Sequence, residues 1–148
     1  MGDQISNDGS NKLNIRARTN KAVGIISDIM IFLDEMCIGG KFYFKSAIFM
    51  REAHLVNGIL FNSETWYNIS ETEMRELEEM DESLLRKILK AHTKTPIEAL
   101  YLELGCLPLR YIVMARRLNY LHYLLNLKND ELLYNFFKAQ EEFPTKND

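Results

Sequence analysis

Apolar residues recur along this chain at the three- and four-residue steps that place them on one face of a helix. The first series begins at Asn11 and ends near Met36, just before Gly39 and Gly40, which are expected to stop it. Further series follow, separated by short polar turns. The pattern predicts six helices, over about residues 11–36, 42–61, 71–91, 95–105 and 108–127, and from a cap at 129–130 to about 140.

Local signals mark where two of these helices begin. Ser70 followed by Glu73 has the spacing of a capping box, and Ile69 and Met74 are placed as a hydrophobic staple on either side of it. Residues 95–98 (TPIE) predict a second capping box, with proline at the first helical position, where its missing N–H is harmless. Both helices are therefore expected to start at defined residues.

The first ten residues follow a different pattern. Residues 2–6 fit a short strand, and residues 7–10 (NDGS) are typical of a tight turn. Six helices joined by short turns, with no internal repeat, predict an all-α fold: a single bundle with a short N-terminal strand remnant. We expect residues 1–10 to be that remnant, and residues 11–62 and 63–148 to be two helical segments packed as one domain.

Charge and composition narrow the class of protein. Eighteen Lys and Arg residues against 21 Asp and Glu give a net charge of −3, so any contact with nucleic acid must come from a local basic patch. The polar start is unlike a signal peptide, and no apolar run approaches the roughly 20 residues that cross a bilayer. Cys37 and Cys106 are predicted to be buried free thiols. The expected location is intracellular, in the cytoplasm or nucleus.

No constellation for catalysis or metal binding stands out. The acidic residues of the predicted 71–91 helix are expected to favour the positive end of its dipole and to solvate its outer face. His54, His92 and His122 lack partners at zinc-ligand spacing and are predicted to be structural. Apolar surroundings of the two cysteines would raise a thiol pKa rather than lower it. The sequence therefore predicts no catalytic residue, no metal ligand and no cofactor.

Basic residues give the more suggestive signal. They cluster at the start of the first predicted helix and recur on the fifth, where tyrosines are interleaved with them, and Arg and Tyr on one face can grip phosphates and stack on bases. An exposed helix face with snorkelling side chains is the alternative interpretation. The candidate nucleic-acid-binding residues are Lys12, Arg16, Arg18 and Lys21, with Arg110, Arg116 and Arg117 as a second set.

Several segments resemble one family. These are residues 63–67 (SETWY), 77–86 (LEEMDESLLR), 100–112 (LYLELGCLPLRYI), 115–121 (ARRLNYL) and 137–140 (FKAQ). They resemble the helical region downstream of the polymerase palm in non-LTR retrotransposon reverse transcriptases. Residues 2–10 (GDQISNDGS) are similar to the strand and turn that leave the palm in that family. The resemblance covers almost the whole chain.

The resemblance implies a fragment of an RNA-directed DNA polymerase. The fingers and the palm, with the Tyr-x-Asp-Asp turn that binds catalytic magnesium, would precede this region, so no polymerase activity is expected of the chain alone. Its first helices would correspond to the thumb, which lies against the RNA or DNA template–primer duplex. Faces normally covered by the palm would be open to self-association. Thumb-like binding is sequence-independent because it uses the backbone of the duplex.

A second hypothesis comes from a different class of protein. An acidic all-α module for protein–protein interaction, domesticated or unrelated to the polymerase, would fit the same helices. Its candidate anchors are aromatic, although such residues belong more often to the core. They are Phe42, Tyr43, Phe44, Trp66 and Tyr67. Salt-dependent duplex binding distinguishes the two hypotheses.

Overall fold

The computed structural model describes residues 12–36, 41–66, 69–127 and 132–142, and within these ranges the fold is all-α, as predicted. The proposed strand remnant at residues 1–10 lies outside the described residues. The elements are α1 (Lys12–Met36), α2 (Lys41–Met50), the π-helical turn η1 (Arg51–Val56), α3 (Asn57–Ile59), the 3₁₀ turn η2 (Ser63–Thr65), α4 (Glu71–Leu89), α5 (Ile97–Leu104), α6 (Leu109–Leu125) and α7 (Leu132–Glu142).

The second predicted helix forms a continuous rod from residue 41 to residue 59, but it is not one α-helix. Its middle turn, η1, is a π-helix, and α2 and α3 flank it. The wider π turn holds Arg51, Leu55 and Val56 in the interior. Gly58 lies close to α1, because a Cβ atom there would come within 3.1 Å of Ile25 Cδ1.

The predicted start of α4 is confirmed. Ser70 Oγ accepts a hydrogen bond from the Glu73 N–H at 3.2 Å, and Glu73 Oε2 accepts one from the Ser70 N–H at 2.8 Å, which completes the capping box. The second box is wrong: α5 begins only at Ile97, and no side chain caps it. Pro96 is the cap residue itself, because its backbone is extended, with ψ at 137°.

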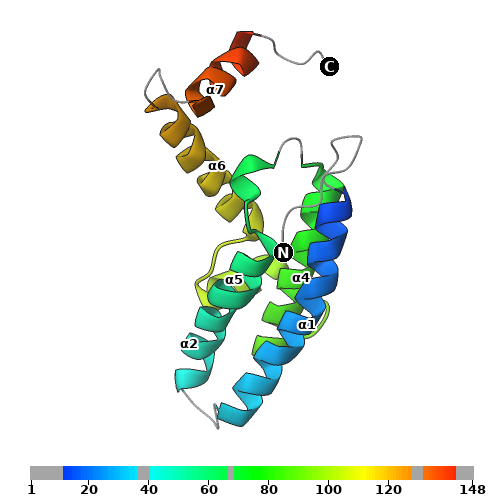
Figure 1. Ribbon diagram of the computed structural model, residues 1–148. Coiled ribbons are helices and arrows are strands. Elements are labelled where there is room, and N and C mark those ends of the chain that lie inside the picture. The colour runs from blue at the N-terminus through cyan, green and yellow to red at the C-terminus, as the bar shows by residue number, and fades with distance from the viewer. Residues whose placement is uncertain (1–11, 37–40, 67–68, 128–131, 143–148) are drawn as a thin grey trace.

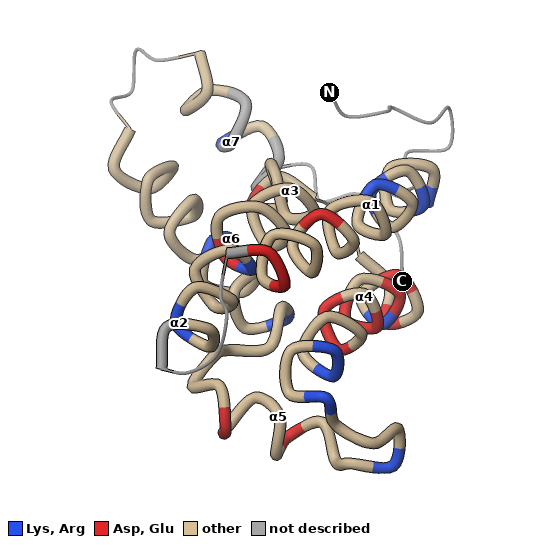
Figure 2. Tube along the Cα trace, turned by 90° about the horizontal axis from the view of Figure 1, so that it is seen from below, with Lys and Arg blue, Asp and Glu red and all other residues tan. Residues whose placement is uncertain are grey.

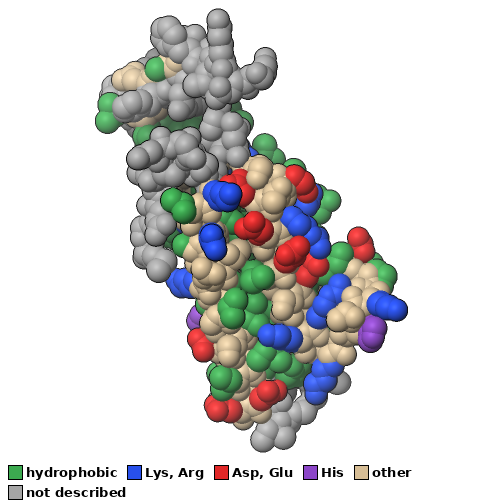
Figure 3. All heavy atoms as spheres, turned by 90° about the vertical axis from the view of Figure 1, so that its right-hand side faces the viewer, with side chains coloured by type: hydrophobic (Ala, Val, Ile, Leu, Met, Phe, Trp, Pro, Cys, Tyr) green, Lys and Arg blue, Asp and Glu red, His purple; other side chains and the backbone are tan. Residues whose placement is uncertain are grey.

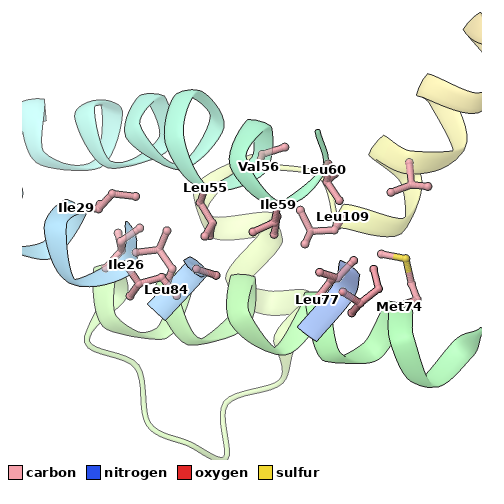
Figure 4. Close-up of a cluster of buried hydrophobic side chains, with 14 of the residues drawn as sticks. Ile26, Ile29, Leu55, Val56, Ile59, Leu60, Met74, Leu77, Leu84 and Leu109 are labelled. Atoms are coloured by element: carbon pink, nitrogen blue, oxygen red, sulfur yellow. The ribbon is translucent and has the colours of Figure 1, made fainter. Parts of the chain in front are cut away.

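The main core lies between α1, α4 and the 41–59 rod. In Figure 1, α1 and α4 run beside each other and the rod lies alongside α1; the rod contacts both helices, and α6 contacts α4. Figure 4 shows side chains from these elements pointing into a common interior, among them Ile26, Leu55, Leu77 and Leu109. A smaller cluster of Leu85, Leu100, Tyr101 and Cys106 joins α5 to the end of α4.

The sequence pattern predicts that the acidic residues of α4 solvate its outer face. For two of them this prediction is wrong. Glu78 is 5% exposed and Asp81 is fully buried. Asp81 accepts two hydrogen bonds from Arg51, at 2.6 and 2.7 Å, and a third from the Tyr101 hydroxyl at 3.0 Å. Burial of these carboxylates is possible because arginines from distant parts of the chain neutralise them.

Helix α6 begins in the core and then leaves it. Leu109 and Val113 are buried against the main cluster, whereas most side chains beyond residue 116 are exposed. Figure 1 shows α6 leading away from α1, α2 and α4, with α7 beyond its far end. Among the described residues, no helix combines the length and the apolar character that crossing a membrane requires.

Candidate nucleic-acid interface

The N-terminal half of α1 has charge of one sign. Between Lys12 and Ser27 there are four Lys or Arg residues and no Asp or Glu. Lys12, Arg16 and Lys21 are exposed and form no ion pair with any residue that the structure describes. Figure 2 shows blue segments at this end of α1, whereas α4 carries mostly red segments along its first turns. Helix geometry places Lys12 and Arg16 on one side of α1 and Lys21 on the other, so these exposed cations flank the helix and do not form one cluster.

The fourth cation, Arg18, faces inward. It is 8% exposed, its Nε donates to Asn14 Oδ1 at 2.9 Å, and its Nη1 donates to the Ile59 carbonyl at 3.2 Å. Its guanidinium lies over the Trp66 ring, 5.0 Å from the centroid, in a cation–π contact. Arg18 thus joins α1 to the end of the 41–59 rod, and it is not part of the exposed set.

Arg110 is engaged in ion pairs with α4. It donates to both carboxylate oxygens of Glu78, at 2.8 and 2.7 Å, and to Glu71 at 2.9 Å. These hydrogen bonds, to Glu78 first and Glu71 second, raise the pKa of Arg110 above its ordinary value. The positive charge of Arg110 is offset by two carboxylates, so Arg110 gives little attraction for a phosphate.

Arg116 and Arg117 differ although they are adjacent. Arg116 is half-buried and donates to the Leu60 carbonyl at 2.6 Å and to Asn57 Oδ1 at 2.8 Å. Arg117 is exposed, and no ion pair joins it to another described residue. The second candidate set therefore leaves one surface cation, Arg117, without a partner in the part of the chain that the structure describes.

Two hollows lie beside these residues and share part of their lining. The larger, of about 760 Å³, lies between α1 and the 41–59 rod, and its charged or titratable lining residues are Arg18, Lys21, Asp28 and His54. The smaller, of about 620 Å³, lies between the end of the rod and α6. Asn57 and Phe61 line both. These two residues therefore lie between the two hollows, of which one is on the α1 side and the other on the α6 side.

The smaller hollow is lined by amide and aromatic groups together with Arg116 and the carboxylate of Glu64, and the Asn57 amide oxygen already accepts a hydrogen bond from Arg116. Amide groups can hydrogen-bond to bases or phosphates, and aromatic rings can stack on bases. Phe61 is 58% exposed. Sequence reasoning did not single out the asparagines or Phe61, because they come from three separate segments that only the fold brings together. The lining is Asn57, Phe61, Asn62, Glu64, Arg116, Asn119 and Tyr120.

Basic and acidic side chains are interspersed on the face that carries α1 and α4. Figure 3 shows blue and red side chains beside one another there, with green apolar side chains between them. The positive group on α1 is therefore local and does not extend over a whole face. Attraction to a phosphate backbone would be correspondingly modest and sensitive to salt.

The described part of the chain also contains His, Cys, Asp and Glu side chains outside these surfaces. No group of three or more His, Cys, Asp or Glu side chains is placed to hold a metal ion there. His92 is exposed, and its Nδ1 accepts a hydrogen bond from the Lys94 N–H at 3.1 Å. Cys106 is a buried free thiol whose pKa is raised by that burial, as predicted, whereas Cys37 lies outside the described residues.

The aromatic residues proposed as partner anchors are divided between core and surface. Trp66 is 4% exposed and packs in the main core, Tyr43 is half-buried, and Phe44 is 48% exposed. The Phe42 side chain and Tyr67 lie outside the described residues. These aromatics therefore do not form a single exposed patch among the residues described.

Comparisons of the chain with models of known protein families, with curated proteins and with solved structures gave no match.

Proposed function

We propose that this chain is the thumb and following helical region of a non-LTR retrotransposon reverse transcriptase, and that it supports binding of the template–primer duplex. The observation that carries the proposal is the set of three exposed cations, Lys12, Arg16 and Lys21, on a stretch of α1 that contains no Asp or Glu. The resemblance of residues 100–112 and 115–121 to that family points to the same conclusion. Such a role belongs inside the cell, in the cytoplasm or nucleus.

The duplex would be held through its backbone. Lys12 and Arg16 would contact phosphates on one side of α1, Lys21 would contact phosphates on the other side, and Arg117 would add a contact from α6. Lys21 borders the larger hollow, so a backbone bound to Lys21 would pass next to that hollow. Contacts of this kind do not read sequence, as expected of a surface that must slide along any template.

Chemistry is not part of this role. Nucleotide addition by two metal ions needs clustered carboxylates, which in the resembled family belong to the palm. The buried carboxylates described here, Glu78 and Asp81, are hydrogen-bonded to arginines and hold helices together. The proposed contribution of the chain is affinity for the duplex and not catalysis.

Fluorescence anisotropy with a labelled RNA–DNA hybrid of about 20 base pairs tests the proposal. The triple variant Lys12→Ala, Arg16→Ala, Lys21→Ala should bind at least about tenfold more weakly than the wild type at low salt, because three phosphate contacts are lost. All three side chains are exposed, so the variant should retain the wild-type circular dichroism spectrum and melting temperature.

A matched control removes three exposed cations elsewhere. Lys45, Lys87 and Lys94 lie on α2, at the end of α4 and in the turn before α5. Their triple alanine variant changes the net charge by the same amount and should bind almost as tightly as the wild type. Equal losses in both triple variants would mean that only net charge matters, and would refute the assignment to α1.

A further inference from the structure

Helix α6 is apolar on two sides. One side carries Leu109 and Val113 into the main core. The other carries five large apolar side chains that remain between 42% and 66% exposed. We call this second side the α6 stripe: Tyr111, Met114, Leu118, Leu121 and Leu125.

The spacing of the α6 stripe is that of a helix–helix seam. Its members follow one another at alternating steps of three and four residues, which is the a and d pattern of a coiled coil over two heptads. No charged residue interrupts it. A surface helix ordinarily shows one apolar side, so an outward apolar side in heptad register indicates contact with another helix.

The stripe is large enough to hold two copies of the chain together weakly. Five large side chains at these exposures offer about 500 Å² per copy, so pairing two stripes would bury about 1,000 Å² in total. That area is at the lower limit for a specific interface and corresponds to a reversible dimer. A second copy also has access to the surface beside the α6 stripe, because α6 leads away from the rest of the fold (Figure 1).

We propose that the α6 stripe pairs with the α6 stripe of a second copy of this chain. A neutral stripe with heptad spacing is complementary to itself, and a two-fold axis places the same surface of each copy at the interface. Leu118 is the middle residue of the stripe, so it packs against Leu118 of the second copy whether the two helices run parallel or antiparallel. Of the residues proposed to contact the duplex, only Arg117 lies on α6, beside Leu118 and outside the α6 stripe.

Sedimentation velocity without nucleic acid tests this proposal directly. The wild-type chain should shift from monomer to dimer between about 1 and about 500 µM, the range expected of a small interface. Leu118→Glu and Leu118→Lys should each remain monomeric, because like charges would meet at the centre of the pair. A 1:1 mixture of the two variants should recover the dimer at low salt, since opposite charges would then face each other.

The control places the same charge on an equally open apolar residue outside the stripe. Leu102 on α5 is 82% exposed, and Leu102→Glu should dimerise like the wild type. A wild type that stays monomeric at about 500 µM would overturn the proposal. So would dimers of Leu118→Glu alone, or a mixture of the two Leu118 variants that stays monomeric although both are helical.

Discussion

Arg51 joins three parts of the fold. It lies on the π turn of the 41–59 rod with no exposed surface, pairs with Asp81 of α4 through two hydrogen bonds, and donates a third to the Leu107 carbonyl just before α6 at 2.9 Å. Tyr101 of α5 donates to the same carboxylate. Burial by itself lowers the pKa of Arg51, but the hydrogen bond and charge of Asp81 outweigh it and raise that pKa. The guanidinium therefore stays charged.

Loss of Arg51 should be costly because it leaves the Asp81 carboxylate buried without a counter-charge. Arg51→Met is expected to lower the free energy of unfolding by about 3–5 kcal/mol, measured by urea denaturation. The double variant Arg51→Met, Asp81→Leu should recover much of that loss, since it removes both charges. Arg75→Met is the control, because the ion pairs of Arg75 with Glu79 and Glu82 lie at the surface, and it should cost less than about 1 kcal/mol. Equal costs for Arg51→Met and the control would contradict this account.

Tyr101 should make the fold sensitive to high pH. Burial first, and the Asp81 carboxylate second, raise the pKa of its hydroxyl above the ordinary value of 10.0. Above that pH the unfolded chain loses the Tyr101 proton and the folded chain keeps it, so the free energy of unfolding falls as pH rises, by up to about 1.4 kcal/mol per pH unit. Tyr101→Phe should flatten the slope between pH 10 and 11.5, measured by urea denaturation at each pH. Tyr123→Phe, at an exposed position, should leave the slope unchanged.

Arg16 and Arg18 lie two residues apart and have different roles. Arg18→Ala removes hydrogen bonds to Asn14 and Ile59 and the contact with Trp66, so it should lower the free energy of unfolding by about 1–3 kcal/mol. Arg16→Ala should change it by less than about 0.5 kcal/mol, because Arg16 is exposed. Thermal melts of the two variants measure this difference in stability. An Arg18→Ala variant as stable as the wild type would show that these contacts contribute little to the stability of the fold.

The sequence could locate the basic residues of α1 but could not say which of them are free. Arg16 and Arg18 have the same side chain, and only the rotation of the helix relative to α4 and the rod decides that one points out and the other in. For Arg110 and Arg116 the partners lie more than 30 residues away in the sequence, so no local pattern indicates that they are used internally.

Helix boundaries that depend on neighbouring residues were predictable, and those that depend on distant ones were not. The capping box of Ser70 and Glu73 uses atoms three residues apart, and it forms as expected. The π turn at Arg51–Val56 is associated with a contact to Asp81, 30 residues on, and the sequence pattern there predicts only a continuous helix. At α5 the residue types at 95–98 fit a capping box, but the backbone of Pro96 is extended. The helix therefore begins one residue later, at Ile97, without a side-chain cap.

Two glycines allow a matched test at the level of helices. Gly105 caps α5 with a φ of 63°, and a Cβ there would meet no atom within 4 Å, so its constraint is conformational and not steric. Gly105→Ala should therefore destabilise the fold by about 1 kcal/mol. Gly24 is exposed within α1 and equally uncrowded, and Gly24→Ala should stabilise the fold by about 0.5–1 kcal/mol. Melting temperatures that move in the same direction would contradict this reasoning.

At the scale of the whole molecule, helical periodicity in the sequence predicted the all-α class. It did not predict the two hollows or the outward apolar side of α6. The two hollows form only where α1 and α6 lie on either side of the segment that contains Asn57 and Phe61. Periodicity assigns apolar residues to a helix face, yet it does not tell which of the two apolar sides of α6 enters the core. Both features depend on how helices are arranged, and pattern along a single chain carries little information about that.

The most direct test of the central claim is the salt dependence of duplex binding by the wild-type chain. If Lys12, Arg16, Lys21 and Arg117 contact phosphates, the logarithm of the association constant for a labelled RNA–DNA hybrid should fall with the logarithm of salt concentration with a slope of about −3 to −4. The triple alanine variant on α1 should reduce that slope to about −1. Absence of binding at low salt, or a slope that the triple variant leaves unchanged, would contradict a template–primer role for this surface.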